Sequence, residues 1–403
     1  MQKTIQKFDF LVVGGGIFGI TAVIELAKRK YRAALINPDS IPHHLAASTD
    51  VTKAVRMEYG SDTSYFKMAE ICVQRWKDWN DLFNTKLYHE VGFLMLCKSH
   101  LNSEHQHFEK HSYDNLIQNG YRAQRLNRED LKKQFPGINS LAFEDACYNP
   151  DAGYAESGLT VEVLKRYARS LGVSVCEGQT LKEMVINSGK VQGIKTKEGT
   201  TFYCDHAIIA AGSSTPYVIP ELSPYMKSTG HPVFWVKPEN PMHFNASRFP
   251  VFTVDISNSG WYGFPFLPKH GIIKFAKHAA GTVIHPDKDD RHVGQENIRD
   301  LRTMLQYAFP ELKDAPLVNT RLCLYTDTLD GHFWIDNHPD IKGLSVSTGG
   351  SGHAFKMAPL LGELTADMAE GKSHPFSKRF RWRHLTSDSL QAEEARCVTD
   401  RRL

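Results

Sequence analysis

Residues 8–19 read Phe-Asp-Phe-Leu-Val-Val-Gly-Gly-Gly-Ile-Phe-Gly, and this stretch decides the fold. The apolar run Phe10–Val13 predicts a buried parallel strand, and the apolar spacing of Ile20–Arg29 predicts a helix. A tight turn joins them, and it carries the pattern Gly-x-Gly-x-x-Gly at Gly14, Gly16 and Gly19. A strand, glycine turn and helix in this order bind the pyrophosphate of a dinucleotide.

The three glycines have separate tasks in such a unit. The first permits the tight turn, the second lets a phosphate approach the backbone, and the third lets helix and strand pack closely. Free N–H groups at the start of the helix, around Ile17 and Phe18, are expected to face the anion. The alternative interpretation is a glycine-rich turn that binds no ligand.

Length and composition limit the remaining classes of protein. The chain has 403 residues, which predicts two closely joined domains. Its formal net charge of +3 argues against a dedicated nucleic-acid binder, and no run of about 18 apolar residues is present to span a membrane. Seven scattered cysteines without a Cys-x-x-Cys pair indicate reduced thiols in an intracellular protein, and we expect no metal site.

The second strand of the nucleotide-binding unit is expected at Arg32–Ile36. Rossmann units usually end this strand in Asp or Glu, which binds the adenosine ribose. Here the position is Asn37, and Asp39 follows two residues later. We expect Asn37 to bind a ribose hydroxyl more weakly than a carboxylate would.

Later elements favour FAD over NAD as the dinucleotide. Glu156–Leu171 reads as an amphipathic helix, and a short strand ending at Cys176 follows it. A β-ribbon around Gly189 and Gly199 then leads into an apolar strand that ends at Gly212. This order resembles the one in which FAD-binding Rossmann proteins pass their cofactor, and NAD dehydrogenases usually lack it. We therefore expect Cys176 and Gly212 to lie at the cofactor.

The sequence predicts an α/β (α+β two-domain) fold in which the chain alternates between its two domains. A Rossmann-type FAD-binding domain is expected from residues 1–86, 151–215 and 323–385. A substrate domain with an antiparallel sheet is expected from residues 87–150 and 216–322. Residues 386–403 are polar, and we expect a flexible tail there.

Residues 41–60 predict a polar loop with a chemical role. Ser48 and Thr49 are small polar residues that suit a cofactor contact. Lys53 and Arg56 stand three residues apart, so they would share one face of a helical turn. The alternative is a solvated basic surface.

Four stretches together resemble the sarcosine-oxidase-like branch of the glycine/D-amino-acid oxidase family of flavoproteins, which includes pipecolate and fructosyl amino acid oxidases. They are VVGGGIFG (12–19), TKAVRMEYG (52–60), WYGFPFLPKHGIIKFAKH (261–278), and RLCLYTDTLDGHFWIDNHP (321–339) with GGSGHAFKMAP (349–359). The resemblance spans Phe8 to Gly371. It implies an oxidoreductase that oxidises the C–N bond of a secondary amine to an imine, with electrons passing through FAD to dioxygen to give hydrogen peroxide.

Cys323 aligns with the family cysteine that bonds through sulfur to the 8α-methyl group of the flavin. A thioether at this place fixes the cofactor and raises its reduction potential. The alternative for Cys323 is a buried structural thiol.

The resemblance also assigns a catalytic cation. Lys274 stands in the otherwise apolar stretch Gly271–Ala276 and matches the family lysine over the flavin ring, which speeds the reaction with dioxygen. His278 follows four residues later and resembles an active-site histidine, with a surface histidine as the alternative. Tyr262 and Tyr325 resemble family positions near the substrate, Tyr325 as a catalytic candidate, although both could equally be core aromatics.

Two further cations match residues that bind the carboxylate of the substrate in sarcosine-type enzymes. Arg56 supplies a planar fork for two carboxylate oxygens, and Lys356 acts as a point charge. Lys356 ends a glycine-rich turn that includes Gly352 and His353 and is expected to bring N–H groups to the flavin. The alternative for either cation is a surface charge.

Two positions depart from the sarcosine-type pattern. Those enzymes carry a histidine and an arginine where this chain has Thr49 and Lys53, which looks more like the fructosyl amino acid oxidases. We therefore expect a monomeric oxidase of an N-substituted amino acid or amine. The alternatives are a fructosyl amino acid oxidase, an imine-forming tailoring oxidase, a flavin-dependent dehydrogenase and a binding subunit without activity.

The expected location is the cytoplasm. The nucleotide-binding strand begins so near Met1 that we expect no secretory signal. The last three residues, Arg401-Arg402-Leu403, faintly resemble a peroxisomal address, so the peroxisome is a second expectation.

Overall fold

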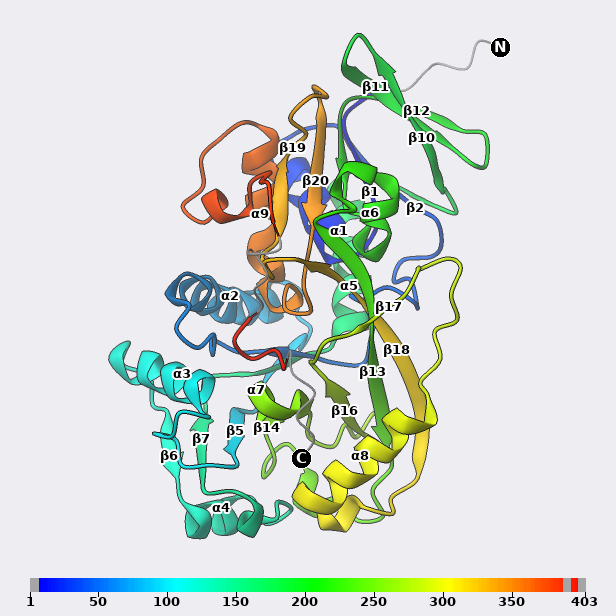
Figure 1. The fold of residues 1–403 in the computed structure, drawn as a ribbon. Helices are drawn as coiled ribbons and strands as arrows, with labels where there is room; N and C mark the ends of the chain where they lie inside the picture. The colour runs from blue at the N-terminus through cyan, green and yellow to red at the C-terminus, as the bar shows by residue number, and fades with distance from the viewer. Residues whose placement is uncertain (1–6, 387–392, 398–403) are drawn as a thin grey trace.

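The computed structural model describes residues 7–386 and 393–397, and two large sheets organise it (Figure 1). The first sheet has eight strands, and its centre is parallel: β1 lies between β2 and β12, and β12 also pairs with β20. This is the Rossmann-type sheet that the sequence predicts. Its strands are β1 (Lys7–Val13), β2 (Ala33–Asn37), β9 (Ser174–Glu177), β10 (Leu181–Asn187), β11 (Lys190–Thr196), β12 (Thr201–Ile209), β19 (Trp334–Asn337) and β20 (Leu344–Thr348).

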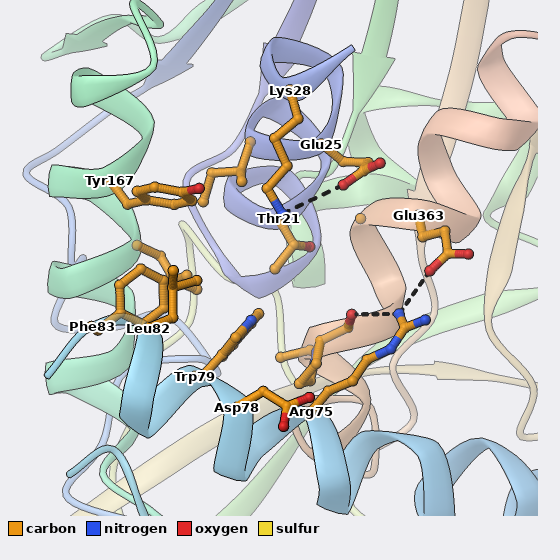
Figure 2. Close-up of a pocket in the computed structure, with 15 residues that line it drawn as sticks. Thr21, Glu25, Lys28, Arg75, Asp78, Trp79, Leu82, Phe83, Tyr167 and Glu363 are labelled. Atoms are coloured by element: carbon orange, nitrogen blue, oxygen red, sulfur yellow. Dashed lines mark hydrogen bonds and ion pairs between the residues drawn. The ribbon is translucent and has the colours of Figure 1, made fainter. Parts of the chain in front are cut away.

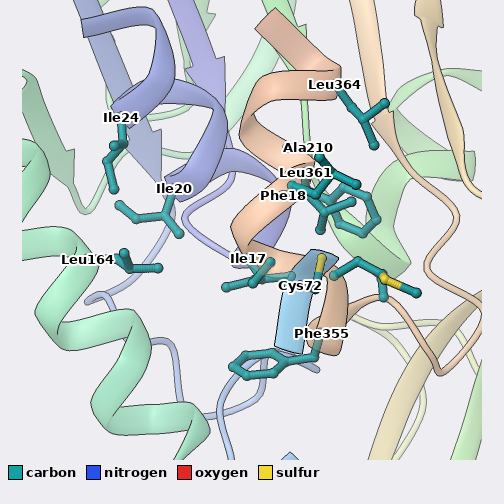
Figure 3. Close-up of a cluster of buried hydrophobic side chains, with 14 of the residues drawn as sticks. Ile17, Phe18, Ile20, Ile24, Cys72, Leu164, Ala210, Phe355, Leu361 and Leu364 are labelled. Carbon is teal, nitrogen blue, oxygen red and sulfur yellow. The ribbon is translucent and has the colours of Figure 1, made fainter. Parts of the chain in front are cut away.

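Helices cover this sheet because its central strands are apolar along their length. Every residue of β2 and of β20 is buried, as expected for a parallel sheet that is covered on both faces. Helix α1 packs against α5 and α9, and Ile20, Leu164 and Leu361 belong to one hydrophobic cluster between them (Figure 3). The helices on this side are α1 (Ile17–Lys28), α2 (Thr63–Leu82), α5 (Ser157–Ser170) and α9 (Ala358–Ala369).

The second sheet has nine strands and is antiparallel except where β5 pairs in parallel with β14. Its apolar face packs on α8, whose Leu301 and Leu305 share a cluster with Phe252 and Phe275. The strands are β5 (Phe93–Cys97), β6 (Gln124–Leu126), β7 (Asp145–Asn149), β13 (Met226–Val236), β14 (Val251–Val254), β15 (Trp261–Gly263), β16 (Ile273–Lys277), β17 (Thr282–Val283) and β18 (Leu317–Thr328), and the helices are α3 (His107–Gln118), α4 (Arg128–Gln134), α7 (Ile256–Ser259) and α8 (Gln295–Ala308).

A small third sheet contains the segment that carries the loop residues of interest. It consists of β3 (Lys53–Val55), β8 (Gly153–Ala155) and β4 (Tyr88–Glu90), with β8 in the middle. Lys53 therefore lies in a strand, and the helical turn expected for Lys53 and Arg56 is wrong. The two side chains nevertheless line one cavity, because Arg56 lies just beyond the end of β3.

Two further features differ from the sequence-based expectations. The strand with Cys323 belongs to the second sheet as far as Thr328, so a boundary drawn at 323 falls inside β18. Residues 393–397 of the expected flexible tail are packed on the protein: Ala395 is fully buried, and Cys397 forms a β-bridge with Ala279. The physical reason is a buried apolar contact flanked by ion pairs, which a polar composition does not reveal.

No helix within residues 7–386 and 393–397 is long and apolar enough to cross a membrane.

Substituting Gly19 tests whether the glycine turn is fixed by close packing. Gly14 has φ +106°, and a Cβ added at Gly19 would lie 1.9 Å from the Gly14 carbonyl oxygen. We expect Gly19→Ser to lower the free energy of unfolding by about 1–3 kcal/mol, because strand and helix must separate. Equilibrium urea unfolding measures this. Gly294→Ser is the matched control, since its Cβ would find its nearest neighbour at 3.7 Å and serine suits this helix N-cap.

Candidate active site

The residues predicted for substrate and catalysis gather at one small cavity, of about 60 Å³, where segments of the two large sheets meet. Its walls include eight of the predicted positions: Lys53, Arg56, Tyr262, His278, Tyr325, Gly352, His353 and Lys356. A larger hollow of about 260 Å³ lies elsewhere, between α1, α2, α5 and α9, and Arg75, Trp79 and Glu363 line it (Figure 2). None of the predicted site residues lines that hollow, so the small cavity is the candidate active site.

A chain of hydrogen bonds fixes Lys356 in the cavity wall. Its Nζ donates to the Tyr59 hydroxyl at 3.1 Å and to the His353 carbonyl oxygen at 3.2 Å. His353 Nε2 must donate to the Gly331 carbonyl oxygen, which only accepts, so Nδ1 accepts from Tyr59. Burial lowers the pKa of Lys356 to about 7 and that of His353 to about 3. Because burial disfavours the ammonium form of Lys356, a bound anion would stabilise that form.

Arg56 is the second cation of the cavity, with only 6% of its surface exposed. Its Nη2 donates to Glu393 Oε1 at 2.6 Å, while Nη1 is buried without a hydrogen-bond partner among the described residues. The rings of Tyr59 and Phe93 lie 5.2 and 5.6 Å from the guanidinium carbon. Nη1 and Nη2 together form the planar pair of donors that a carboxylate needs, and Glu393 occupies one of the two.

Lys274 is fully buried in β16 and is neutralised by a carboxylate that the sequence analysis did not assign. Its Nζ lies 2.6 Å from Asp50 Oδ2 and donates to the Thr52 carbonyl oxygen at 2.5 Å. Lys53 Nζ lies 3.4 Å from the same Asp50 oxygen. Burial lowers the pKa of Lys274 to about 8, although Asp50 acts against this shift. Because Lys274 and Lys53 share the single carboxylate of Asp50, this part of the site carries net positive charge.

Cys323 and Tyr325 lie on β18, which pairs along its length with β13. Cys323 is 1% exposed and belongs to a small cluster with Ala276 and Tyr325. The Tyr325 ring stacks on His231, with 3.8 Å between ring centroids. His278 Nε2 lies 3.4 Å from Glu393 Oε2, and burial lowers the pKa of this histidine. The predicted thiol and aromatic residues thus share the cavity region with the cations.

The predicted nucleotide-binding residues lie at the carboxyl ends of β1, β2 and β9. Ser48 Oγ accepts from the Ile17 N–H at 2.9 Å. Asn37 Oδ1 accepts from Gly15 N–H at 2.8 Å, and its Nδ2 donates to the Asp39 carbonyl oxygen. Each end of this carboxamide makes one hydrogen bond within the protein, so Asn37 holds the glycine turn, and the ribose contact stays a prediction. Cys176 is the half-buried penultimate residue of β9, and open space faces Gly212, which follows β12.

These residues fit an FAD molecule. The expectation of a free N–H at Ile17 is wrong, because Ser48 Oγ accepts from it. Helix α1 has no acidic residue in its first turn, so its positive end still favours a pyrophosphate. The hydroxyls of Thr49 and Thr52 are buried without hydrogen-bond partners among the described residues. Orphaned hydroxyls of this kind are explained where a bound cofactor supplies the partner.

Three residues of the site were missed by the sequence analysis: Asp50, Tyr59 and Glu393. Asp50 had a usable signal, because a buried Lys274 needs a carboxylate partner and Asp50 stands two residues before the motif TKAVRMEYG that contains Arg56. Tyr59 is the penultimate residue of that motif. Glu393 had no such signal, because it stands in a polar stretch that is far in sequence from the other residues of the site.

The fold and the site define an enzyme that uses a bound dinucleotide, and comparison with known families gives the family. A family model described as FAD dependent oxidoreductase matches residues 9–368. The chain therefore belongs to this family of FAD-dependent oxidoreductases. This finding confirms the predicted fold class, cofactor and enzyme class.

Individual relatives show which members of this family the chain resembles. The chain is 28% identical to L-saccharopine oxidase of Schizosaccharomyces pombe, with 99% of this chain and 96% of that protein aligned. It is 26% identical to monomeric sarcosine oxidase of Bacillus sp. strain B-0618, over 90% and 92% of the two chains. Fructosyl peptide oxidase from E. terrenum has the same fold, with a TM-score of 0.84, 20% identity and coverage of 97% and 95%. The predicted resemblance is confirmed.

Removing the Asp50 charge tests the burial of Lys274. We expect Asp50→Asn to lower the free energy of unfolding by about 3–5 kcal/mol, because it leaves a buried ammonium without its partner. Urea unfolding at pH 7 measures the loss. Asp205→Asn is the control: its half-exposed pair with Lys7 should contribute less than about 1 kcal/mol. Equal effects of the two variants would contradict the assignment.

Proposed function

We propose that this enzyme oxidises the C–N bond of an N-substituted amino acid to an imine and reduces dioxygen to hydrogen peroxide. The observation that carries the proposal is a pair of buried cations, Arg56 and Lys356, that line one small cavity. Names of relatives support the substrate class, since they include oxidases of sarcosine, N-methyl-L-tryptophan and L-saccharopine.

In this proposal Arg56 and Lys356 bind the carboxylate of the substrate. The Arg56 guanidinium offers a planar pair of donors, and the Tyr59 hydroxyl holds Lys356 in place beside it. The amine then lies among His278, Tyr262 and Tyr325 in the same cavity. No side-chain base is required, because the lone pair of the deprotonated amine assists the oxidation. His278 is neutral at neutral pH, since burial lowers its pKa, and so it does not repel a substrate ammonium.

FAD, when bound, takes two electrons from the substrate and delivers them to dioxygen. We propose that the start of α1 holds its pyrophosphate, with Gly14, Gly16, Ile17, Phe18 and Gly19 forming the turn and Ser48 supporting it. Thr49 and Lys53 then face the cofactor, as do Gly352 and His353 of the turn before α9. Lys274 supplies fixed positive charge for the reaction with dioxygen, and Asp50 positions it.

A second candidate is an amino acid with a bulky polar N-substituent, such as a fructosyl amino acid. The observation that favours it is Lys53, a third cation on the cavity wall that a small N-methyl group would leave unused. Anaerobic stopped-flow mixing with a series of substrates separates the candidates. Bleaching of the flavin band by N-methyl amino acids but not by fructosyl-glycine or fructosyl-valine favours the first, and the reverse order favours the second. Failure of every amine would refute both.

For the location we propose the cytoplasm or the peroxisome, and for the assembly a monomer. One relative, 27% identical over 92% of this chain, is the peroxisomal sarcosine oxidase of Homo sapiens. The tripeptide Arg401–Leu403 lies outside the described residues.

Lys356 should make carboxylate binding depend on pH. Because burial lowers the pKa of Lys356 to about 7, its ammonium is present below pH 7 and is lost as pH rises through that value. The dissociation constant of acetate, a minimal carboxylate, should therefore increase between pH 6 and pH 8.5. Titration calorimetry of the holoenzyme measures it. Lys356→Met should bind acetate weakly and with little pH dependence. Lys277→Met is the control, because Lys277 lies on β16 and does not line the cavity, and it should behave like the unchanged protein.

Cys323 should determine whether the flavin is bonded to the chain. Acid precipitation of the purified protein is expected to leave the yellow colour in the pellet. With Cys323→Ser the colour should pass into the supernatant, because no sulfur is present at that position to hold the 8α-methyl group. Cys204→Ser is the control, since that thiol is buried in β12 within a different cluster. Release of the flavin from the unchanged protein would show that no bond forms.

A further inference from the structure

A segment near the end of the chain places a carboxylate between the two cations of the site. Glu393 lines the cavity, and Oε1 accepts from Arg56 Nη2 at 2.6 Å. Its second oxygen lies 3.4 Å from His278 Nε2. Burial would raise the pKa of Glu393, but Arg56 and Lys356 outweigh this effect and hold it well below its usual value. The cavity therefore contains an ionised carboxylate that belongs to the protein itself.

The segment that carries this carboxylate is held at both of its ends. We call residues 393–397 the C-terminal strap. At its far end the Cys397 N–H donates to the His278 carbonyl oxygen at 3.1 Å, and the Ala280 N–H donates to the Cys397 carbonyl oxygen at 2.9 Å. At its near end Glu394 accepts from the Ser61 N–H at 3.2 Å.

An ion pair and one apolar contact complete the attachment of the C-terminal strap. Arg396 donates through both terminal nitrogens to Asp327, at 2.7 and 2.5 Å. Ala395 is fully buried in the cluster that contains Phe108. Of the five described residues of the strap only Ala395 and Cys397 are buried, so the strap exposes less apolar surface when it leaves than a strand of either sheet would.

Glu393 satisfies the same groups that the proposed substrate needs. The Arg56 donor that Glu393 occupies and the Lys356 ammonium are the carboxylate-binding pair of the proposed function. A substrate carboxylate held by both terminal nitrogens of Arg56 needs Nη2, which Glu393 occupies, and it carries the same charge as Glu393 beside Lys356, so both cannot occupy this place at once. Without either of them, the one carboxyl group left near both cations among the described residues would be Glu58, and burial raises the pKa of Glu58 and so disfavours its ionised form.

We propose that Glu393 is an internal substitute for the substrate carboxylate and that the C-terminal strap must move away when an anionic amino acid binds. This inference rests on the proposed function, because it takes Arg56 and Lys356 as the pair that binds the substrate. The strap then sets the affinity of the enzyme: it raises the dissociation constant of every carboxylate by the reciprocal of the fraction of molecules in which it is open. An amine that lacks a carboxylate leaves Glu393 in place.

The variant Glu393→Gln tests the proposal, because it keeps the shape of the side chain and removes its charge. Titration calorimetry of the holoenzyme with acetate should show a dissociation constant lowered about tenfold, as for a strap closed in about nine of ten molecules. The KM for sarcosine should fall by a similar factor while kcat changes little. Glu311→Gln makes the same charge change in a surface pair with His243, and it should leave both constants unaltered.

An unchanged or increased dissociation constant for acetate in Glu393→Gln would overturn the proposal, because Glu393 would then not compete with the ligand. If Glu393→Gln does not fold, Glu393→Asp takes its place: the side chain is one methylene shorter, so its hold on Arg56 weakens and acetate should bind severalfold more tightly. Acetate binding that is no tighter than in the unchanged protein would again count against it.

The two proposals fail in different ways. If no amine reduces the flavin in any variant but Glu393→Gln still binds acetate more tightly, the proposed function fails and the competition by Glu393 stands. If N-methyl amino acids are oxidised but acetate and sarcosine bind equally well to both forms, the function stands and the role of the strap is wrong.

Discussion

The burial of positive charge between the two large sheets is the constraint on which the site depends. Lys274 is fully buried, and Arg56 and Lys356 are 6% and 5% exposed. An unpaired ammonium or guanidinium in such surroundings is strongly unfavourable, so each must have a carboxylate near it. Asp50 serves Lys274, and Glu393 serves Arg56 and Lys356. The positive potential that a carboxylate substrate and dioxygen require is stable only because these two acids are present.

The alternation of the chain between the sheets assembles this charge. Arg56 follows a strand of the small third sheet, Lys274 comes from β16 of the second sheet, and Lys356 precedes α9, which covers the first sheet. The long pair β13–β18 forms the part of the wall that carries Cys323 and Tyr325. Because no single sheet contains all of these residues, the cavity forms only when both sheets have folded and packed together.

The sequence predicts those parts of the site that local patterns encode. The glycine turn, the apolar strand before it and the covering helices follow from periodicity and the special conformation of glycine, and the structure has them close to the expected bounds. The motif resemblance then places Arg56, Lys356 and Tyr325 on one cavity. Long-range pairing is what local patterns cannot give. Helix α3 was missed because its buried positions include Glu109 and Ser112 beside Phe108 and Leu116, which obscures the apolar stripe. Glu393 was missed because its partner lies 337 residues away.

The two carboxylates differ in how they are held, and the difference separates a permanent counter-ion from an exchangeable one. Asp50 lies in a loop that Arg321 clamps by donating to the backbone carbonyls of Ala46 and Thr49, and its carboxylate also contacts Lys53. Its removal would leave the buried Lys274 without its carboxylate partner. Glu393 lies on the C-terminal strap, whose described residues are joined to the protein by hydrogen bonds and by the ion pairs of Glu393 with Arg56 and of Arg396 with Asp327. A carboxylate from solution can replace it without leaving any charge uncompensated, because the incoming group carries the same charge. In the proposed exchange, Arg56 and Lys356 stay buried and neutralised between turnovers, and only a ligand that restores the charge balance takes the place of Glu393.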